Sequence, residues 1–269
     1  MESENIPRTL LAKQLGIYRN KFYYKKKKKD KDWKLKIQIE EVLRIHPSYG
    51  SRRLAIHLKI NRKRVKRVMN IFGIKAYRRR GKKWKKTKNI QVKYPNLLLT
   101  TYPVRQNQIW VTDFTYLKFQ GKWIYVSTIM DLYTRKIIGL QIADNHKLPL
   151  QLGTLFSALN NNPRPEIFHS DNGSEYDSKI FTSGLIKLGI QISRSKPGCP
   201  WENGYQESFY DKFKIDLGDP TRFKTLGELV SEIYQTIYTY NNTRIHSALR
   251  MSPQEFINTN CGNKIFALH

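Results

Sequence analysis

The chain has 269 residues, with 49 Lys and Arg against 21 Asp and Glu and a formal net charge of +28. This length allows one large domain or two modest ones with a real hydrophobic core, and the charge predicts a polyanionic partner. No apolar run approaches the roughly 20 residues of a spanning helix and no signal peptide opens the chain, which argues against a membrane protein and predicts a cytoplasmic location.

The positive charge is concentrated at the front of the chain. Residues 1–100 carry 31 Lys and Arg against 6 Asp and Glu, a net of +25, whereas residues 101–269 carry 18 against 15, a net of +3. Such an asymmetry is typical of nucleic-acid-binding arms and less typical of a membrane-surface anchor. We therefore expect a basic helical DNA-binding region over residues 1–94.

Three short helices are expected in this region. In the first, from residue 33, apolar residues form one stripe from Leu35 to Leu43, and a shorter helix follows Gly50. Asn61 is a good cap for the third, and Gly73 is a natural stop. Three short helices with a basic last one suit a helix-turn-helix-like module over about residues 33–75.

The third helix carries the candidate DNA contacts of this module. Its outer face consists of Arg62, Lys63, Arg64, Lys66 and Arg67. These side chains could merely solvate a helix face, but no acidic residue lies between Arg44 and Lys93. Phosphate contact explains the one-signed pattern better and predicts salt-dependent binding. The flanking runs over residues 23–32 and 77–89 are expected to be exposed connectors, within a basic linker over residues 76–94.

From about Gln108 the residue pattern becomes typical of alternating strands and helices. The expected strands are residues 109–119, 123–133, 136–143, 166–171 and 190–195, and the expected helices between them are residues 148–161 and 178–189. The first three strands are joined by short turns and predict an antiparallel meander. The order predicts an α/β domain. The ribonuclease-H-like fold has this order, with three antiparallel strands followed by parallel ones, although periodicity alone does not exclude other α/β folds.

Three carboxylates stand out in this second region. Asp113 lies inside an apolar strand, where an uncompensated charge is costly, and Asp171 ends a later strand. Glu207 lies in an expected helix, with 35 residues between it and Asp171. A lone Asp is more often structural, and Asp171 could simply form the turn with Asn172 and Gly173. Carboxylates on separate elements that a fold brings together can instead bind divalent ions and support phosphodiester chemistry.

The motifs around these residues resemble one family. "WVTDFTY", "HSDNGSEY" and "PGCPWENGYQESF" resemble the three acidic motifs of retroviral-integrase-like transposases of the insertion-sequence family three type, and the 35-residue gap matches the family's DD(35)E pattern. "MDLYTRKIIG" and "YNNTRIHSAL" resemble further segments of the core. "YGSRRLAIHL" and "NRKRVKRVM" resemble the helix-turn-helix segment before it. The resemblance spans nearly the whole chain.

This resemblance implies a DNA transposase that cleaves and transfers DNA strands, with a ribonuclease-H-like core and its helical extension over residues 101–262. Asp113, Asp171 and Glu207 would hold Mg²⁺ or Mn²⁺, two ions when DNA is bound. The implied partners are the element ends, target DNA and further copies of the chain. An upstream-frame DNA-binding product or a fusion with it is also expected, because the chain starts without that segment. The implied location is the bacterial cytoplasm, at the nucleoid when DNA is bound.

Two lysines are hypothesised to contact DNA near the metals. Lys214 shares a helix face with Asn203, Glu207 and Asp211 at spacings of three or four residues, and Lys196 precedes that helix. Both could equally be solvated surface lysines. Asp211 is an alternative metal ligand beside Glu207.

Other residues near the motifs are expected to have structural roles. Glu202 is a rival acid, but its gap from Asp171 is 30 residues. Asp131 is expected in a turn, and His169 in the structure of its strand. No zinc site is expected, because the histidines of the basic region lack paired cysteines.

Two departures from the family pattern and two rival functions remain. Ile245 replaces a common Pro, which bears on packing of the tail, and "PWENGYQES" differs from the usual wording before the Glu. A non-catalytic DNA-binding relic would have no reason to keep three acids. A nuclease that only hydrolyses nucleic acid would use the same site, so sequence alone does not separate it from a transposase.

Overall fold

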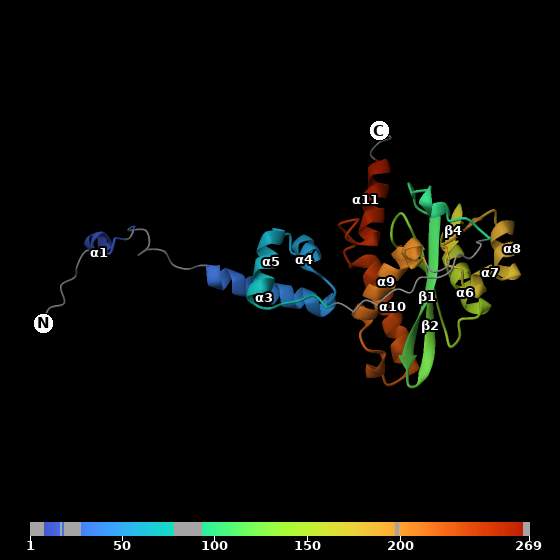
Figure 1. Ribbon diagram of the computed structural model, residues 1–269, viewed down its shortest axis with the longest axis horizontal. Coiled ribbons are helices and arrows are strands. Elements are labelled where there is room, and N and C mark those ends of the chain that lie inside the picture. Colours follow the sequence, from blue (N-terminus) through green and yellow to red (C-terminus); the bar gives the residue numbers. More distant parts are fainter. Residues whose placement is uncertain (1–7, 17, 19–27, 78–92, 197–198, 266–269) are drawn as a thin grey trace.

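The computed structural model describes residues 8–16, 18, 28–77, 93–196 and 199–265. Figure 1 shows a small helical module beside a larger α/β core, with helix α1 (Arg8–Gln14) separate from both. Most of the expected linker, residues 78–92, lies outside the described residues, as does the run over residues 23–27. No helix in the described ranges combines the length and the apolar character needed to cross a bilayer.

A single five-stranded sheet forms the centre of the α/β core. Its strands are β1 (Ile109–Phe119), β2 (Lys122–Asp131), β3 (Ile137–Ala143), β4 (Ile167–Ser170) and β5 (Gln191–Arg194). The spatial order is β3-β2-β1-β4-β5, with the first three strands antiparallel and β4 and β5 parallel to β1. Gln120 and Gly121, at φ 45° and 79°, form the two-residue turn that such a hairpin favours. The expected meander followed by parallel strands is confirmed.

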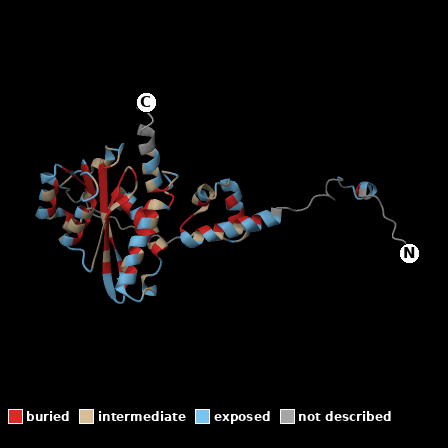
Figure 2. Ribbon diagram, turned by 180° about the vertical axis from the view of Figure 1, so that it is seen from behind, coloured by how far each residue is buried: buried red, intermediate tan, exposed pale blue. Residues whose placement is uncertain are grey.

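Helices cover both faces of the sheet (Figure 1). One face carries α9 (Gly204–Leu217) and α10 (Leu226–Asn242). The other face carries α6 (Leu148–Leu159) and α8 (Lys179–Lys187), with α7 (Ser174–Asp177) beside them. Because strand side chains alternate, Val111 packs toward α9 and α10 while Trp110 packs toward α6 and α8. Figure 2 shows the buried residues concentrated in the sheet and on the inner sides of the helices.

Short elements complete the core. They are the 3₁₀ helices η1 (Leu97–Leu99), η2 (Pro200–Asn203) and η3 (Pro220–Arg222) and the last helix, α11 (Pro253–Ile265). Helix α10 is capped by Thr225, whose hydroxyl accepts from the Glu228 N–H at 3.2 Å. The Glu228 carboxylate accepts from the Lys224 N–H at 2.8 Å, so the return bond goes to the residue before the cap.

The helical module consists of α3 (Lys28–Ile45), α4 (Ser51–His57) and α5 (Arg62–Ile71), which confirms the three expected helices. Its buried core includes Leu35, Ile39, Leu54, Val65 and Val68. The first helix starts earlier than expected, so residues 28–32 are helical rather than part of a connector. Asp32 is 7% exposed and accepts two hydrogen bonds from the Arg67 guanidinium, at 2.8 and 2.5 Å, which joins this first turn to α5.

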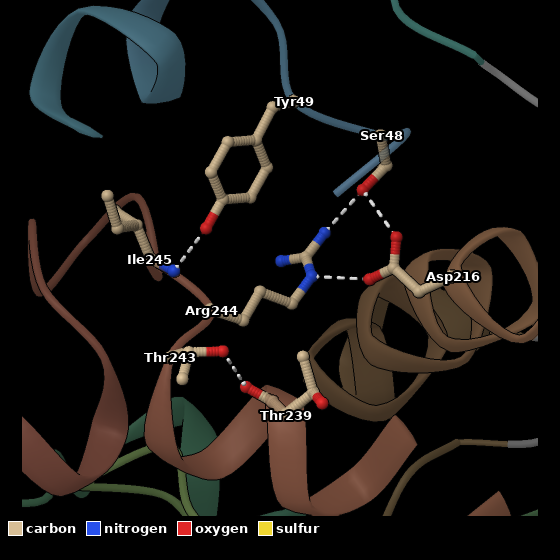
Figure 3. A network of polar contacts seen from close by, with 7 residues as sticks. All are labelled: Ser48, Tyr49, Asp216, Thr239, Thr243, Arg244 and Ile245. Atoms are coloured by element: carbon tan, nitrogen blue, oxygen red, sulfur yellow. Dashed lines mark hydrogen bonds and ion pairs between the residues drawn. The ribbon is translucent and has the colours of Figure 1, made fainter. Parts of the chain in front are cut away.

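A buried polar network attaches the module to the core (Figure 3). The Arg244 guanidinium donates to the Asp216 carboxylate and to the Ser48 hydroxyl, each at 2.6 Å, and Ser48 donates to Asp216 at 3.1 Å. The Ile245 N–H donates to the Tyr49 hydroxyl at 2.6 Å. A proline at position 245 could not make this bond, because it has no N–H. The departure at Ile245 therefore coincides with a contact between core and module.

Candidate active site

Asp113 and Asp171 belong to neighbouring parallel strands. The β1–β4 register pairs Val111 with His169, and Asp113 and Asp171 each lie two residues further along the chain, Asp171 just after the end of β4. Because strand side chains alternate, Asp113 belongs to the sheet face on which Val111 packs against α9, and Asp171 is close enough to raise the pKa of Asp113. The acids of the two strands thus meet at one edge of the sheet, beneath the helix that carries Glu207.

The start of α9 is fixed on β1 by buried hydrogen bonds. Gln206 donates to the Val111 carbonyl at 2.6 Å, and the Tyr210 hydroxyl donates to the Asp113 carbonyl at 2.6 Å. Glu207 lies between these two anchors in the sequence and has an exposed side chain. The bonds hold the first turn of α9 beside Asp113 while leaving the Glu207 carboxylate accessible.

Asn203 does not share the exposed face of Glu207, contrary to the sequence-based expectation. It is 5% exposed and donates to the Thr112 carbonyl at 3.2 Å. The reason is that Asn203 ends η2, so the helical spacing that starts at Gly204 does not extend back to it. The anchors Gln206 and Tyr210 were not predicted. Their signal was present as polar groups on the same side of α9 as Phe213.

Acidic side chains are gathered around Asp113. Burial and the nearby Asp171 and Glu207 carboxylates together raise the pKa of Asp113 to about 8, against the opposing effects of the Phe114 N–H and of Lys214. Burial also raises the pKa of Asp171, and burial followed by Asp211 raises that of Glu207. Repulsion between the three groups in a partly dry site is the arrangement that a cation would relieve.

The residues fit a hard divalent ion in their chemistry. Carboxylate oxygens are the ligands that Mg²⁺ and Mn²⁺ prefer, and the electrostatic coupling of Asp113 to Asp171 and Glu207 places the three in one neighbourhood. Within the described ranges, no group of three or more His, Cys, Asp or Glu is already gathered at metal-binding distance. Because the Glu207 side chain is exposed, it has room to move toward Asp113 and Asp171 when an ion binds.

Asp171 also forms the turn that follows β4. Its carboxylate accepts from the Gly173 N–H at 3.0 Å, and the Asn172 amide donates to the Ser195 carbonyl. The same carboxylate raises the pKa of Asp113, so Asp171 also belongs to the acidic neighbourhood. Turn formation and ligand binding are therefore compatible roles for this residue.

Three neighbouring polar residues have structural partners. His169 is buried, with its ring nitrogens 2.8 Å from the Ser193 hydroxyl and 3.1 Å from the Ser195 hydroxyl. Glu202 accepts from the Lys196 N–H at 2.7 Å, which links η2 to the residues that follow β5. Asp131 accepts from the Asn107 and Thr134 N–H groups, both at 2.7 Å, in the turn after β2.

The expected DNA-contacting residues differ in their surroundings. Lys214 lies near the acids, because its charge opposes the raised pKa of Asp113 and its Nζ atom is 5.1 Å from the Tyr116 ring centroid. Lys196 is exposed on the loop before α9. All five basic residues of α5 are exposed, and among them Arg67 is engaged by Asp32.

Comparison with known proteins places this geometry in a family. Residues 103–200 and 188–253 match two family models that are both described as the integrase core domain. The chain is 32% identical over 231 residues to the transposase for insertion sequence element IS904 of Lactococcus lactis, covering 81% of this chain and 91% of that protein. It is 32% identical over 243 residues to the insertion element IS600 uncharacterized 31 kDa protein of Shigella sonnei, covering 85% and 89%.

Among solved structures, the magnesium complex of the HTLV-2 integrase catalytic core is 15% identical, with a TM-score of 0.45 over 58% of this chain and 99% of that one. The sheet order and the two domain matches define a ribonuclease-H-like integrase core, and hence a polynucleotidyl transferase. The chain belongs to the insertion-sequence transposases of the family three type, and it is a DNA transposase.

Proposed function

We propose that Asp113, Asp171 and Glu207 hold the divalent metal ions, Mg²⁺ or Mn²⁺, with which this transposase cleaves and joins DNA. The observation that carries this proposal is the electrostatic contact of Asp113 with two further carboxylates, because burial, Asp171 and Glu207 together raise its pKa to about 8. Strand β1, the turn that follows β4 and helix α9 supply one carboxylate each.

Each residue has a distinct part in this mechanism. When bound, a pair of divalent ions supplies activation of a water or 3′-hydroxyl nucleophile and stabilisation of the leaving oxygen. Asp113 and Asp171 fix the position of the site, because the sheet and the turn at Gly173 hold them. Glu207, on the anchored first turn of α9, would supply the third carboxylate ligand. Lys214, close to Asp113, is placed to contact a DNA phosphate there.

The basic front of the chain is proposed to bind DNA. Arg62, Lys63, Arg64 and Lys66 project from α5 as exposed charges that suit phosphate contact. The proposed division is a DNA-binding region over residues 1–94 and a catalytic core with its helical extension over residues 101–262. We further propose that element ends and target DNA are bound by several copies of the chain, with an upstream-frame product or fusion, at the nucleoid.

Strand transfer by purified protein tests this function. The full chain is incubated with an end-containing duplex, a target duplex and Mg²⁺. Joined products are expected, and they should disappear in Asp171→Asn but persist in the control Asp144→Asn, which changes an exposed loop carboxylate. Hydrolysis without joining would identify a nuclease, and DNA binding without any product would identify a relic.

The same assay assigns the third carboxylate. Glu207→Gln is expected to abolish joining while Asp211→Asn retains it, because Glu207 raises the pKa of Asp113 and Asp211 acts on Glu207. An Asp211→Asn variant as inactive as Glu207→Gln would make Asp211 a ligand as well.

A further inference from the structure

A cavity of 450 Å³ lies where the helical module meets the core. Its wall includes the cationic side chains of Arg53, Arg135, Lys212 and Arg244 and the aromatic side chains of Trp201, Tyr205, Phe209 and Tyr240. Gly204, Ser208 and Lys212 face it from α9 at a spacing of four residues, so the cavity occupies one side of that helix. Glu207 projects from a different side. The cavity is therefore separate from the acidic site but built on the same helix.

The wall of this cavity carries several positive charges and no negative one among the described residues. No Asp or Glu occurs among its wall residues in the part of the chain that the structure describes. Arg244 is paired with Asp216, but within the described residues Arg53, Arg135 and Lys212 have no ion pair. Several positive charges thus share one partly buried space, which an anion would stabilise.

Unsatisfied hydrogen-bond donors support this conclusion. Arg53 Nε and Arg135 Nε and Nη1 are buried, and none has a hydrogen-bond partner within the described structure. Buried donors without partners are costly, and guanidinium groups are suited to phosphate oxygens. Burial and the neighbouring guanidinium groups also lower the pKa of Lys212 and of Arg53. The cavity therefore presents donors that a multi-oxygen anion can satisfy.

The aromatic residues narrow the class of anion. Trp201 is 67% exposed and Tyr205 is 42% exposed, although both belong to the wall. The Arg135 guanidinium carbon lies 4.3 Å from the Tyr205 ring centroid, so charge and aromatic face are adjacent. Nucleobases stack on such faces while phosphates bind beside them. A cavity of 450 Å³ admits one nucleotide, whereas a duplex presents a convex surface that cannot enter.

A second cavity connects this site to the basic helix. It has a volume of 510 Å³, shares Arg53 and Lys212 with the first, and reaches Arg62 at the start of α5. Asp211, one turn after Glu207, belongs to its wall. A DNA strand that contacts α5 could therefore pass over these arginines toward α9.

We propose that the 450 Å³ cavity binds one unpaired nucleotide of the DNA substrate, with its phosphate on Arg53, Arg135 and Lys212 and its base on Trp201 or Tyr205. This inference rests on the proposed function, since it takes DNA as the source of the phosphate. The strand held in the cavity would lie across the start of α9, with its duplex on the side of Glu207.

Equilibrium binding to two labelled DNAs tests the proposal with the full chain. One probe is a blunt duplex and the other is the same duplex with a short single-stranded overhang. The double variant Arg135→Gln with Lys212→Gln is expected to bind the overhang probe at least about tenfold more weakly. Its slope of log affinity against log salt should fall by roughly one to two. Binding to the blunt probe should change by less than about threefold.

The proposed stacking of the base on an aromatic side chain is tested with separate variants. Trp201→Ala is expected to lose about fivefold or more in affinity for the overhang probe alone, and Trp201→Phe to retain most of it. Lys122→Gln is the matched control, because Lys122 is an exposed lysine at the hairpin tip. Unchanged circular dichroism would show that the variants fold. The backbone contacts of Arg135, such as the bond from the Tyr240 hydroxyl to its carbonyl, do not involve the replaced side chain.

The outcomes separate this inference from the proposed function. If the wild type binds and joins DNA but the cavity variants bind the overhang probe as Lys122→Gln does, the inference is wrong and the function stands. Equal losses on the blunt and overhang probes would also overturn it, because they indicate general electrostatics. A wild type that binds neither probe would refute both.

Discussion

The acidic edge of the sheet and the polar network between module and core are built in opposite ways. Asp171 and Glu207 both repel Asp113, whose pKa rises to about 8 with its burial. Asp216, by contrast, is paired with the buried Arg244 at 2.6 Å and bonded to Ser48. A buried charge that already has its partner holds structure together, whereas a cluster without partners is kept for a ligand. The difference separates residues that maintain the fold from residues that serve catalysis.

Removing an acid from the sheet edge should have the largest effect, and on activity alone. Asp113→Asn is expected to reduce strand transfer at least about 100-fold, because loss even of an outer-shell partner of a metal costs roughly 10- to 100-fold. Its free energy of unfolding at pH 7 should stay the same or rise, because the folded state no longer has to keep a proton that the Asp113 carboxyl of the unfolded chain releases. Joined products and urea unfolding measure the two effects. A variant that loses activity only because it is unstable would contradict the comparison.

Removing an acid from the paired network should act on stability first. Asp216→Asn leaves the Arg244 guanidinium, 2% exposed, without its counter-charge. Breaking a buried pair costs roughly 3–5 kcal/mol, so the urea midpoint should fall markedly. Asp144→Asn, at an exposed position, is the control and should be neutral. A loss below about 1 kcal/mol would show that this network does not hold the module on the core.

Acidification should weaken the fold through buried histidines. Burial lowers the pKa of His46 to about 4, that of His169 to about 3 and that of His246 to about 4. The unfolded chain gains protons below pH 6.5 while the folded state does not. This contribution is therefore complete above pH 6.5 and is lost as the pH falls toward 4, at about 2 kcal/mol per histidine by pH 5.

Asp113 titrates with the opposite sign. Its raised pKa means that the folded state keeps a proton that the unfolded state releases, so the contribution of Asp113 to stability is lost as the pH rises through about 8.

The two signs are tested with variants at His46 and Asp113. The charged groups around His46 are Asp216, Arg244, His57 and Arg53. Urea unfolding at pH 7.5 and pH 5 checks both signs. His46→Phe should reduce the fall in stability at pH 5 and Asp113→Asn should not, and a wild type equally stable at both pH values would contradict the account.

The smallest expected effect tests one hydrogen bond of the network. Ile245→Pro removes the N–H that donates to the Tyr49 hydroxyl at 2.6 Å. Loss of a buried bond of this kind costs roughly 1–3 kcal/mol. Ile245→Val keeps the N–H and should cost roughly 0.5–1.5 kcal/mol through packing alone. Equal free energies of unfolding for the two variants would mean that the bond contributes nothing.

Local patterns in the sequence predicted the elements that carry the acids. The alternating aromatic and β-branched residues predicted β1 at its observed bounds, Ile109–Phe119, and the spacing after Asp171 singled out Glu207. The early start of α3 was not predictable, because it depends on an ion pair between Asp32 and Arg67, 35 positions apart. Local periodicity carries no trace of such distant contacts.

The contact between module and core was equally invisible in the sequence. Arg244 and Ser48 are separated by 196 positions, and Ser48 and Asp216 by 168. The cationic cavity beside α9 escaped prediction for the same reason, because Arg53, Arg135 and Lys212 come from three separate elements. The sequence motifs predicted which strand or helix each acid lies in or follows. Only the tertiary structure showed which charges have partners.

The most direct test of the central claim, that the unpaired acids are metal ligands, is a change of ligand and metal at one position. Asp171→Cys is assayed for strand transfer with Mg²⁺ and with Mn²⁺. A thiolate is a poor ligand for Mg²⁺ and a better one for Mn²⁺, so this variant should be inactive with Mg²⁺ and partly active with Mn²⁺. Asp171→Asn should stay inactive with both. An Asp171→Cys variant as active as the wild type with Mg²⁺ would contradict the account.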